Sequence, residues 1–132
     1  PMAAPIVSAR FTPDGLKLAV LREEGTVTLH SAADGAEISR VSLDKRFHRA
    51  LAVSAAGTWC AVGSPQGELV ACEFTSGRRV MLSDKEWSLI RSVEFAPQMD
   101  RIVWCHDFGC VHSASLPELK DHRIRFASKG SL

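Results

Sequence analysis

The densest group of chemistry-bearing side chains lies at residues 105–112, which read Cys-His-Asp-Phe-Gly-Cys-Val-His. Thiolates and imidazoles are the ligands that zinc takes in tetrahedral sites, so Cys105, Cys110 and His112 are candidate metal ligands. The spacing is Cys-x4-Cys-x-His, however, without a second Cys-x-x-Cys half. The alternative is that Cys105 and Cys110 are small buried hydrophobic residues and that the histidines line a loop. We favour this alternative and assign no metal and no cofactor.

His30 is the second candidate, and it stands alone. No acid or nucleophile accompanies it in the sequence, so we expect a partly buried, hydrogen-bonded histidine on a strand rather than a catalytic base. The sequence also lacks a Gly-rich phosphate loop leading to a helix, a paired-histidine metalloprotease helix and a nucleophile elbow. We therefore expect no catalytic residues and no enzyme.

Basic residues near the end of the chain raise the question of nucleic acid. Arg123 and Arg125 alternate with Ile124 and Phe126, which is the pattern of an outer strand with one solvated face. The 16 basic and 15 acidic residues give a net charge of only +1, so there is no field to attract phosphate. The sequence therefore disfavours a nucleic-acid partner.

Length and composition describe one domain or part of one, since the chain has 132 residues, of which 45% are hydrophobic and 23% charged. No apolar run approaches the roughly 18 residues of a membrane span, and the start lacks a signal pattern. Four cysteines are too few for a disulfide scaffold, which indicates reduced thiols and an intracellular, cytoplasmic protein. Pro1 before Met2 is compatible with a start at Met2 or with a segment of a longer polypeptide.

The elements that must position these side chains are set by an internal repeat with a constant offset of 42 residues. Gly25, Gly67 and Gly109 keep this spacing. Three further sets keep it as well: Phe11, Val53 and Phe95; Ala19, Ala61 and Val103; Val27, Leu69 and Val111. A period of about 40 to 45 residues filled with strands is that of a propeller blade, which has four antiparallel strands.

Each repeat unit is expected to contain four short strands joined by tight turns. Pro13-Asp14-Gly15 is a typical turn, because proline fixes φ and glycine accepts a positive φ. The alternation at 26–30 is typical of a half-buried strand. The expected strands are 6–12, 16–22, 26–30 and 36–43, then 49–54, 58–63, 68–74 and 78–82, then 90–96, 101–106, 110–114 and 123–127.

These residues resemble a known family. Ala-Arg-Phe-Thr-Pro-Asp-Gly at 9–15, Leu-Ala-Val at 18–20, Glu-Gly-Thr-Val-Thr-Leu at 24–29 and Asp-Gly at 34–35 resemble one blade of a WD-repeat β-propeller. The Trp-Asp pair of that family would fall at His30-Ser31, Cys72-Glu73 and Ala114-Ser115, so the blades are divergent and the family's side-chain network is not carried over. A quinoprotein-like or other non-WD propeller is the alternative.

The expected fold is all-β, with three four-stranded blades at about 5–43, 48–85 and 90–127 that form an incomplete ring. Propellers close with typically four to eight blades, and closure hides the apolar faces. The two open faces should expose apolar residues, and we expect the isolated chain to aggregate or self-associate. The residues expected on these faces are Phe11, Val20, Val62, Phe95 and Trp104. The missing blades come from a longer chain, from a second copy in a homodimer, or from a different protein.

The resemblance also implies a binding face, because the loops from second to third strands and the connectors between blades emerge on one side. Exposed aromatic residues and arginine are enriched at protein-binding hot spots. Phe47 and Trp87, which precede first strands, could instead pack between blades. The expected partner-binding residues are Arg22, Lys45, Arg46, Phe47, Trp87, His106 and Phe108.

The sequence thus favours a protein–protein interaction scaffold, a WD-repeat-like propeller segment within a larger intracellular assembly. The alternative is a homodimeric six-bladed propeller that binds a small ligand at its central opening. A ligand site built symmetrically from all blades would favour the same polar residues at equivalent loop positions. The equivalent positions read Arg22, Ser64 and His106, then Glu24, Gln66 and Phe108, and do not repeat. An enzyme would require a metal at the 105–112 hairpin.

Overall fold

The computed structural model of the chain describes residues 4–83, 90–97, 101–106, 111–116 and 120–126, and these contain twelve strands. Blade 1 consists of β1 (Ile6–Phe11), β2 (Lys17–Arg22), β3 (Thr26–Ser31) and β4 (Glu37–Ser42). Blade 2 consists of β5 (Leu51–Val53), β6 (Trp59–Gly63), β7 (Leu69–Glu73) and β8 (Arg79–Ser83). Blade 3 consists of β9 (Ile90–Phe95), β10 (Arg101–His106), β11 (Val111–Ser115) and β12 (Lys120–Phe126).

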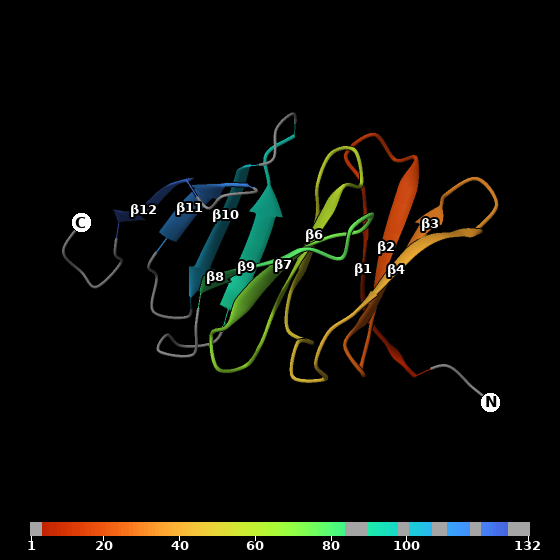
Figure 1. Cartoon of the computed structure of the whole chain (residues 1–132), viewed down its shortest axis with the longest axis horizontal. Coiled ribbons are helices and arrows are strands. Elements are labelled where there is room, and N and C mark those ends of the chain that lie inside the picture. The colour runs from red at the N-terminus through yellow and green to blue at the C-terminus, as the bar shows by residue number, and fades with distance from the viewer. Residues whose placement is uncertain (1–3, 84–89, 98–100, 107–110, 117–119, 127–132) are drawn as a thin grey trace.

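Every blade is a four-stranded antiparallel sheet in which sequential strands are neighbours. The three sheets stand one after another along the molecule, and the ring does not close (Figure 1). The all-β, three-blade fold with an incomplete ring is therefore confirmed. The first strands β1, β5 and β9 contact one another in sequence, so they form the inner edge of the partial ring. No helix in the described part of the chain is long and apolar enough to cross a membrane.

The core consists of two layers, one on each side of blade 2. One layer joins blades 1 and 2 and includes Leu21, Leu29, Val62 and Phe74. The other joins blades 2 and 3 and includes Trp59, Ile102 and Trp104. Residues 59–63 are buried throughout, because β6 lies in the middle sheet and both of its faces are covered.

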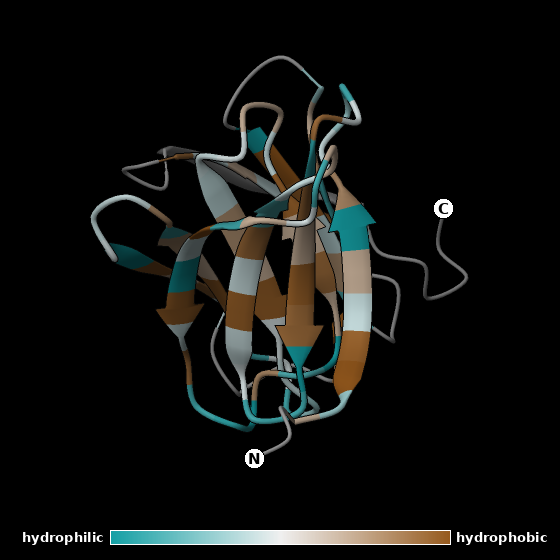
Figure 2. Cartoon of the chain, turned by 90° about the vertical axis from the view of Figure 1, so that its right-hand side faces the viewer, coloured by the Kyte–Doolittle hydropathy of each residue, from teal (hydrophilic) through white to brown (hydrophobic). Residues whose placement is uncertain are grey.

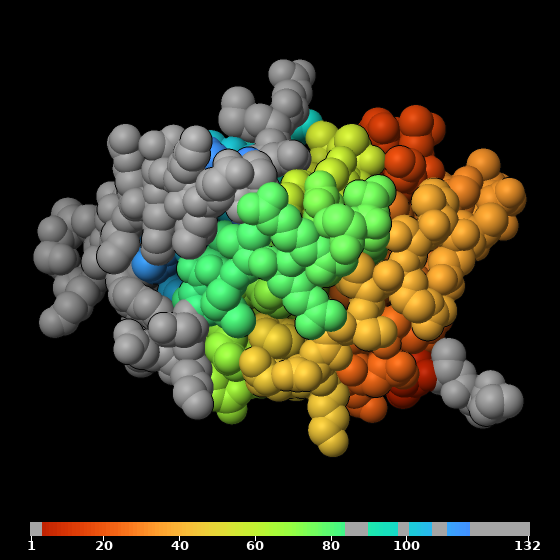
Figure 3. All heavy atoms as spheres, in the orientation of Figure 1, coloured from red at the N-terminus to blue at the C-terminus, as the bar shows by residue number. Residues whose placement is uncertain are grey.

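Polar contacts reinforce the junction of blades 1 and 2. The Ser39 Oγ donates a hydrogen bond to the Phe74 carbonyl over 3.1 Å, and the Arg79 guanidinium donates to the Ser42 carbonyl. Figure 3 shows β8, in green, directly beside the orange and gold residues of blade 1. The first bond links β4 to the residue that follows β7, and the second links β4 to β8.

The expectation about exposed apolar residues is wrong for most of the five positions. Val62, Phe95 and Trp104 are buried because their sides of the sheets face a neighbouring blade. Val20 is buried in the middle of the blade 1 sheet, where Thr28 is its cross-strand neighbour. Only Phe11 is strongly exposed, at 61%.

Candidate functional site

Three loops of the described chain lie at one end of the blades and form what we call the loop face, residues 22–25, 43–49 and 63–68. The first and third loops join a second strand to a third strand, and the middle one connects blades 1 and 2. Because neighbouring strands are antiparallel, these loops emerge together, at the lower end of the molecule in Figure 1. The other hairpins, such as 12–16 and 32–36, lie at the opposite end.

The loop face contains a pocket of about 630 Å³ against the connector between blades 1 and 2. It is lined by Val7, Glu23, Lys45, Arg46 and His48. Lys45 is exposed. Arg22, which precedes Glu23, does not line this pocket, and its guanidinium donates a hydrogen bond to the Ala4 carbonyl over 2.8 Å. The structure thus brings Lys45 and Arg46, two of the residues selected from the sequence, to one concave surface.

Arg46 is held in position by contacts within the connector and with blade 2. Its Nε donates to Glu68 Oε1 over 2.8 Å, and its Nη1 forms an ion pair with Asp44. The guanidinium also lies over the Phe47 ring, 4.7 Å from the ring centroid. The hydrogen bond that Arg46 donates to Glu68 raises the pKa of Arg46 above its usual value. A charged, preorganised arginine costs less conformational entropy when a partner binds.

Two of the expected partner-binding residues are not exposed. Phe47 is 4% exposed and belongs to the apolar layer between blades 1 and 2, so it packs between blades as the alternative stated. His106 is 1% exposed, and its Nε2 lies 3.4 Å from the Ser83 Oγ of blade 2. Both residues are buried because a neighbouring blade packs against them. Trp87 and Phe108 lie outside the described residues.

The geometry of blade 3 argues against the zinc site considered for the 105–112 hairpin. Trp104 pairs with His112 and Cys105 pairs with Val111 across β10 and β11. Directly opposed residues share a face of the sheet, and adjacent residues point to opposite faces, so Cys105 and His112 point away from each other. His112 instead stacks on the Trp104 ring, with the centroids 5.2 Å apart and the planes 5° apart. Cys110 lies outside the described residues.

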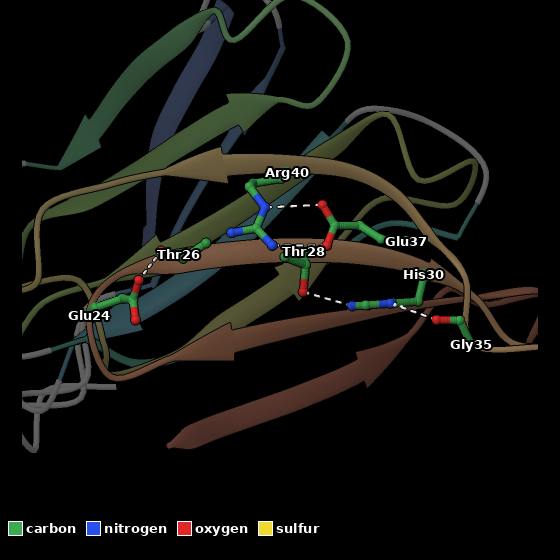
Figure 4. A network of polar contacts seen from close by, with 7 residues as sticks. All are labelled: Glu24, Thr26, Thr28, His30, Gly35, Glu37 and Arg40. Atoms are coloured by element: carbon green, nitrogen blue, oxygen red, sulfur yellow. Dashed lines mark hydrogen bonds and ion pairs between the residues drawn. The ribbon is translucent and has the colours of Figure 1, made fainter. Parts of the chain in front are cut away.

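A second polar site lies on the open face of blade 1; the sequence selected His30 there but not its partners. Figure 4 shows that the His30 ring spans the gap between Thr28 and the Gly35 carbonyl. The Nδ1 atom lies 3.0 Å from the Gly35 oxygen, which can only accept, so Nδ1 carries the proton. The Nε2 atom lies 2.8 Å from the Thr28 Oγ1 and accepts the hydroxyl proton when the ring is neutral. His30 is thus a hydrogen-bonded strand residue, in agreement with the expectation.

An ion pair and a second hydrogen bond complete this network along β3 and β4. Arg40 forms two hydrogen bonds with Glu37, at 2.9 and 3.0 Å, and the Thr26 hydroxyl donates to Glu24 over 3.0 Å. The side chains line a pocket of about 290 Å³. An apolar pocket of about 310 Å³ lies beside it, lined by residues that include Phe11, Leu18 and Val20. The open face is therefore apolar near the inner edge and polar near the outer edge.

One signal in the sequence could have revealed this site. The positions equivalent to Thr28 and His30 in blade 2 are Val70 and Cys72, both buried between blades. The same repeat position is thus apolar in blade 2, where another blade covers it, and polar in blade 1, where no described residue does. Such a change in polarity between repeats indicates that the two sheet faces have different surroundings.

The inner edge of the ring also carries a pocket, of about 280 Å³. It is lined by three equivalent first-strand positions, Arg10, Ala52 and Glu94, together with aromatic and proline residues. These three side chains are a cation, a methyl group and an anion. A symmetric array of identical ligand contacts is therefore not present at the described part of the opening.

Comparisons with known proteins bear on the fold alone. No protein-family model matches the chain, and no curated protein matches it. The solved structures that it matches include RRP9 WD40 repeats and U3-55K, each with a TM-score of 0.71, 13% identity and 96% of this chain covered. The β-propeller domain of Cps50 (Swd1) from Myceliophteria thermophila gives a TM-score of 0.71 at 14% identity over 94% of this chain.

A further match is an enzyme, the hydrazine synthase of Kuenenia stuttgartiensis, with a TM-score of 0.68, 13% identity and 89% of this chain covered. The matched segment makes up 41%, 42%, 40% and 35% of these four chains, respectively. The chain therefore spans about 40% of the length of the WD40 structures that it matches. It has the fold of a partial WD40 β-propeller.

Proposed function

We propose that this chain is a protein-binding propeller segment that acts as a scaffold within a larger intracellular assembly, with the loop face as its contact surface. The WD40 fold is generally used for protein–protein interaction, and the partial ring leaves room for further blades or partners. The observation that carries the proposal is the pocket beside the connector, where an exposed Lys45 lies next to a preorganised Arg46.

The chemistry of this pocket supports binding rather than catalysis. Its lining consists of two basic residues, one glutamate, one histidine and one apolar residue. Among the described residues, no three metal-binding side chains come together. Arg46 already donates to two carboxylates, so Lys45 is the cation that a partner's carboxylate or carbonyl would meet first. One structure with a similar fold is an enzyme, so the fold alone does not decide between binding and catalysis, and we propose binding.

The proposal is tested by reversing one charge on the loop face and one at the opposite end. Lys45→Glu removes the exposed cation of the pocket, and Arg78→Glu makes the same change of charge in the exposed turn between β7 and β8. Each variant is used as bait in quantitative affinity capture from cells that express the chain. We expect Lys45→Glu to lose a defined set of proteins that wild type and Arg78→Glu retain. Identical captured sets for all three baits would rule out the loop face as the contact surface.

A further inference from the structure

The open face of blade 1 occupies a position in the repeat that is covered in the other two blades. Phe11, Val53 and Phe95 are equivalent, and their exposures are 61%, 6% and 7%. Leu18 and Val20 correspond to Cys60 and Val62, which lie in the layer between blades 1 and 2. Figure 2 looks onto this end of the molecule. The face is therefore built to receive the sheet of a preceding blade.

Among the described residues, blade 3 carries the complementary exposed position. Ala19 and Ala61 are fully buried on the sides of blades 1 and 2 that face the next blade. The equivalent residue in blade 3 is Val103, which is 43% exposed. Hence the two ends of the chain present the two halves of one type of sheet contact, which already occurs twice within the molecule.

The contact between blades 1 and 2 shows which groups would meet if blade 3 packed on blade 1. There, the Lys17 Nζ donates to the Ala56 carbonyl over 3.1 Å. The position of Lys17 in blade 1 is occupied in blade 3 by Arg101, and the position of Ala56 in blade 2 is occupied in blade 1 by Asp14. The same geometry would place the guanidinium of Arg101 beside the exposed carboxylate of Asp14, a pair of opposite charges.

A second match occurs at the inner edge. Arg10, Ala52 and Glu94 follow one another around the opening and line one pocket. The next blade in the ring would bring another Arg10 beside Glu94. Both predicted charge contacts are therefore attractive. The Arg10–Glu94 contact joins β1 to β9, and the Asp14–Arg101 contact joins the β1–β2 turn to β10.

We infer that the open face of blade 1 receives blade 3 of a second copy of this chain, and that two copies close a six-bladed ring. A two-fold axis then generates the same contact twice, with two Asp14–Arg101 pairs and two Arg10–Glu94 pairs. The exposed Phe11 and the half-buried Leu18 beside it are covered by the face that carries Val103. This inference goes beyond the proposed function, since it uses neither Lys45 nor the loop face.

The test is the absolute mass of the chain in solution, measured by light scattering on a size-exclusion column over a series of concentrations. We expect a species of twice the 14.4 kDa chain mass for the wild type. Asp14→Arg and Arg101→Asp each place like charges together twice per dimer, so each should weaken dimerisation roughly tenfold or more. The double variant Asp14→Arg/Arg101→Asp restores opposite charges, so it should dimerise again.

A matched control separates the charge contact from damage to a turn. Asp14 accepts hydrogen bonds from the Thr12 hydroxyl and the Leu16 amide at 2.7 and 2.9 Å, and Asp34 accepts one from the Ala36 amide at 3.0 Å in the next hairpin. Asp34→Arg should therefore disturb a similar turn without changing the mass. Circular dichroism verifies that each variant is folded.

Three results would overturn the inference. A monomeric wild type at tens of micromolar would mean that the face receives a blade of a longer polypeptide or of a different protein. A dimer that both single reversals leave intact, or one that the double variant fails to restore, would mean that the contact does not have this register. Lys45→Glu is expected to dimerise like the wild type, so failure of this inference and failure of the proposed function give different results.

Discussion

Replacing Gly25 by alanine should destabilise the chain much more than the same replacement at Gly35, although both glycines have a positive φ. The φ angles are +92° and +77°, so an L residue is strained by roughly 1–2 kcal/mol at either position. A Cβ at Gly35 would meet no atom within 4 Å. A Cβ at Gly25 would lie 2.3 Å from the Asp44 carbonyl oxygen and 2.8 Å from that of Leu43.

The clash at Gly25 cannot be relieved by a side-chain rotation, because the opposing atoms belong to the backbone. The Leu43 amide donates to the Gly25 carbonyl over 3.0 Å, and the Asp44 carbonyl accepts from the Phe47 amide over 3.0 Å. Moving the connector therefore strains these bonds, at an overpacking cost of about 1–3 kcal/mol. A difference of about 2 kcal/mol between the two variants corresponds to roughly 7 °C in Tm for a domain of this size.

Scanning calorimetry of wild type, Gly25→Ala and Gly35→Ala at one protein concentration measures this difference. We expect Gly35→Ala to melt within a few degrees of the wild type and Gly25→Ala to melt well below both. Because the displaced connector carries Lys45 and Arg46, Gly25→Ala should also reduce partner capture. Equal melting temperatures for the two variants would refute the reasoning, since they would show that the connector yields freely.

Three further predictions concern individual side chains. The hydrogen bond from Arg40 lowers the pKa of Glu37 below its usual 4.5, so the ion pair stabilises the fold above that pH and is lost as the pH falls through the lowered pKa. Glu37→Gln should therefore reduce the loss of stability on acidification, measured by circular dichroism. An unchanged dependence of stability on pH would contradict this. Burial raises the pKa of the Cys60 thiol, so mass spectrometry should find it unlabelled by a thiol reagent until urea unfolds the chain; labelling at the unfolded rate in native buffer would disprove its burial. His30→Phe should lower the free energy of unfolding in urea by about 1–2 kcal/mol, because the buried Thr28 hydroxyl loses its partner. Adding Thr28→Val should recover most of this loss. If the effects of the two substitutions were strictly additive, this would argue against the hydrogen bond.

Much of the fold is predictable from the sequence because its signals are local. The 42-residue offset requires the same supersecondary unit three times, and each observed strand begins and ends within three residues of its expected range. Gly25 and Gly67 were identified from spacing alone, and both have φ near +90°. Turn chemistry and the alternation of side chains act over a few residues, so a repeated pattern is sufficient to predict them.

The candidate site is predictable only in part. Lys45 and Arg46 follow from the rule that connectors and second-to-third-strand loops share one end of the blades. Phe47 and His106 do not, because whether an aromatic ring in a connector or a strand-end histidine is exposed depends on the blade packed against it. The same reason applies to Cys105 and His112, whose opposite orientations were left open by spacing and decided by the register of β10 on β11.

The sequence by itself determined the repeat, the strands and turns, the near-neutral charge and the incompleteness of the ring. The tertiary structure decided which repeat positions are covered and which are open, and hence that Phe11 is exposed while Phe95 is buried. It also revealed the His30 network, whose members lie on two strands and a turn. Burial is a property of contacts between blades, so equivalent residues with similar side chains have different surroundings, and only the packed structure distinguishes them.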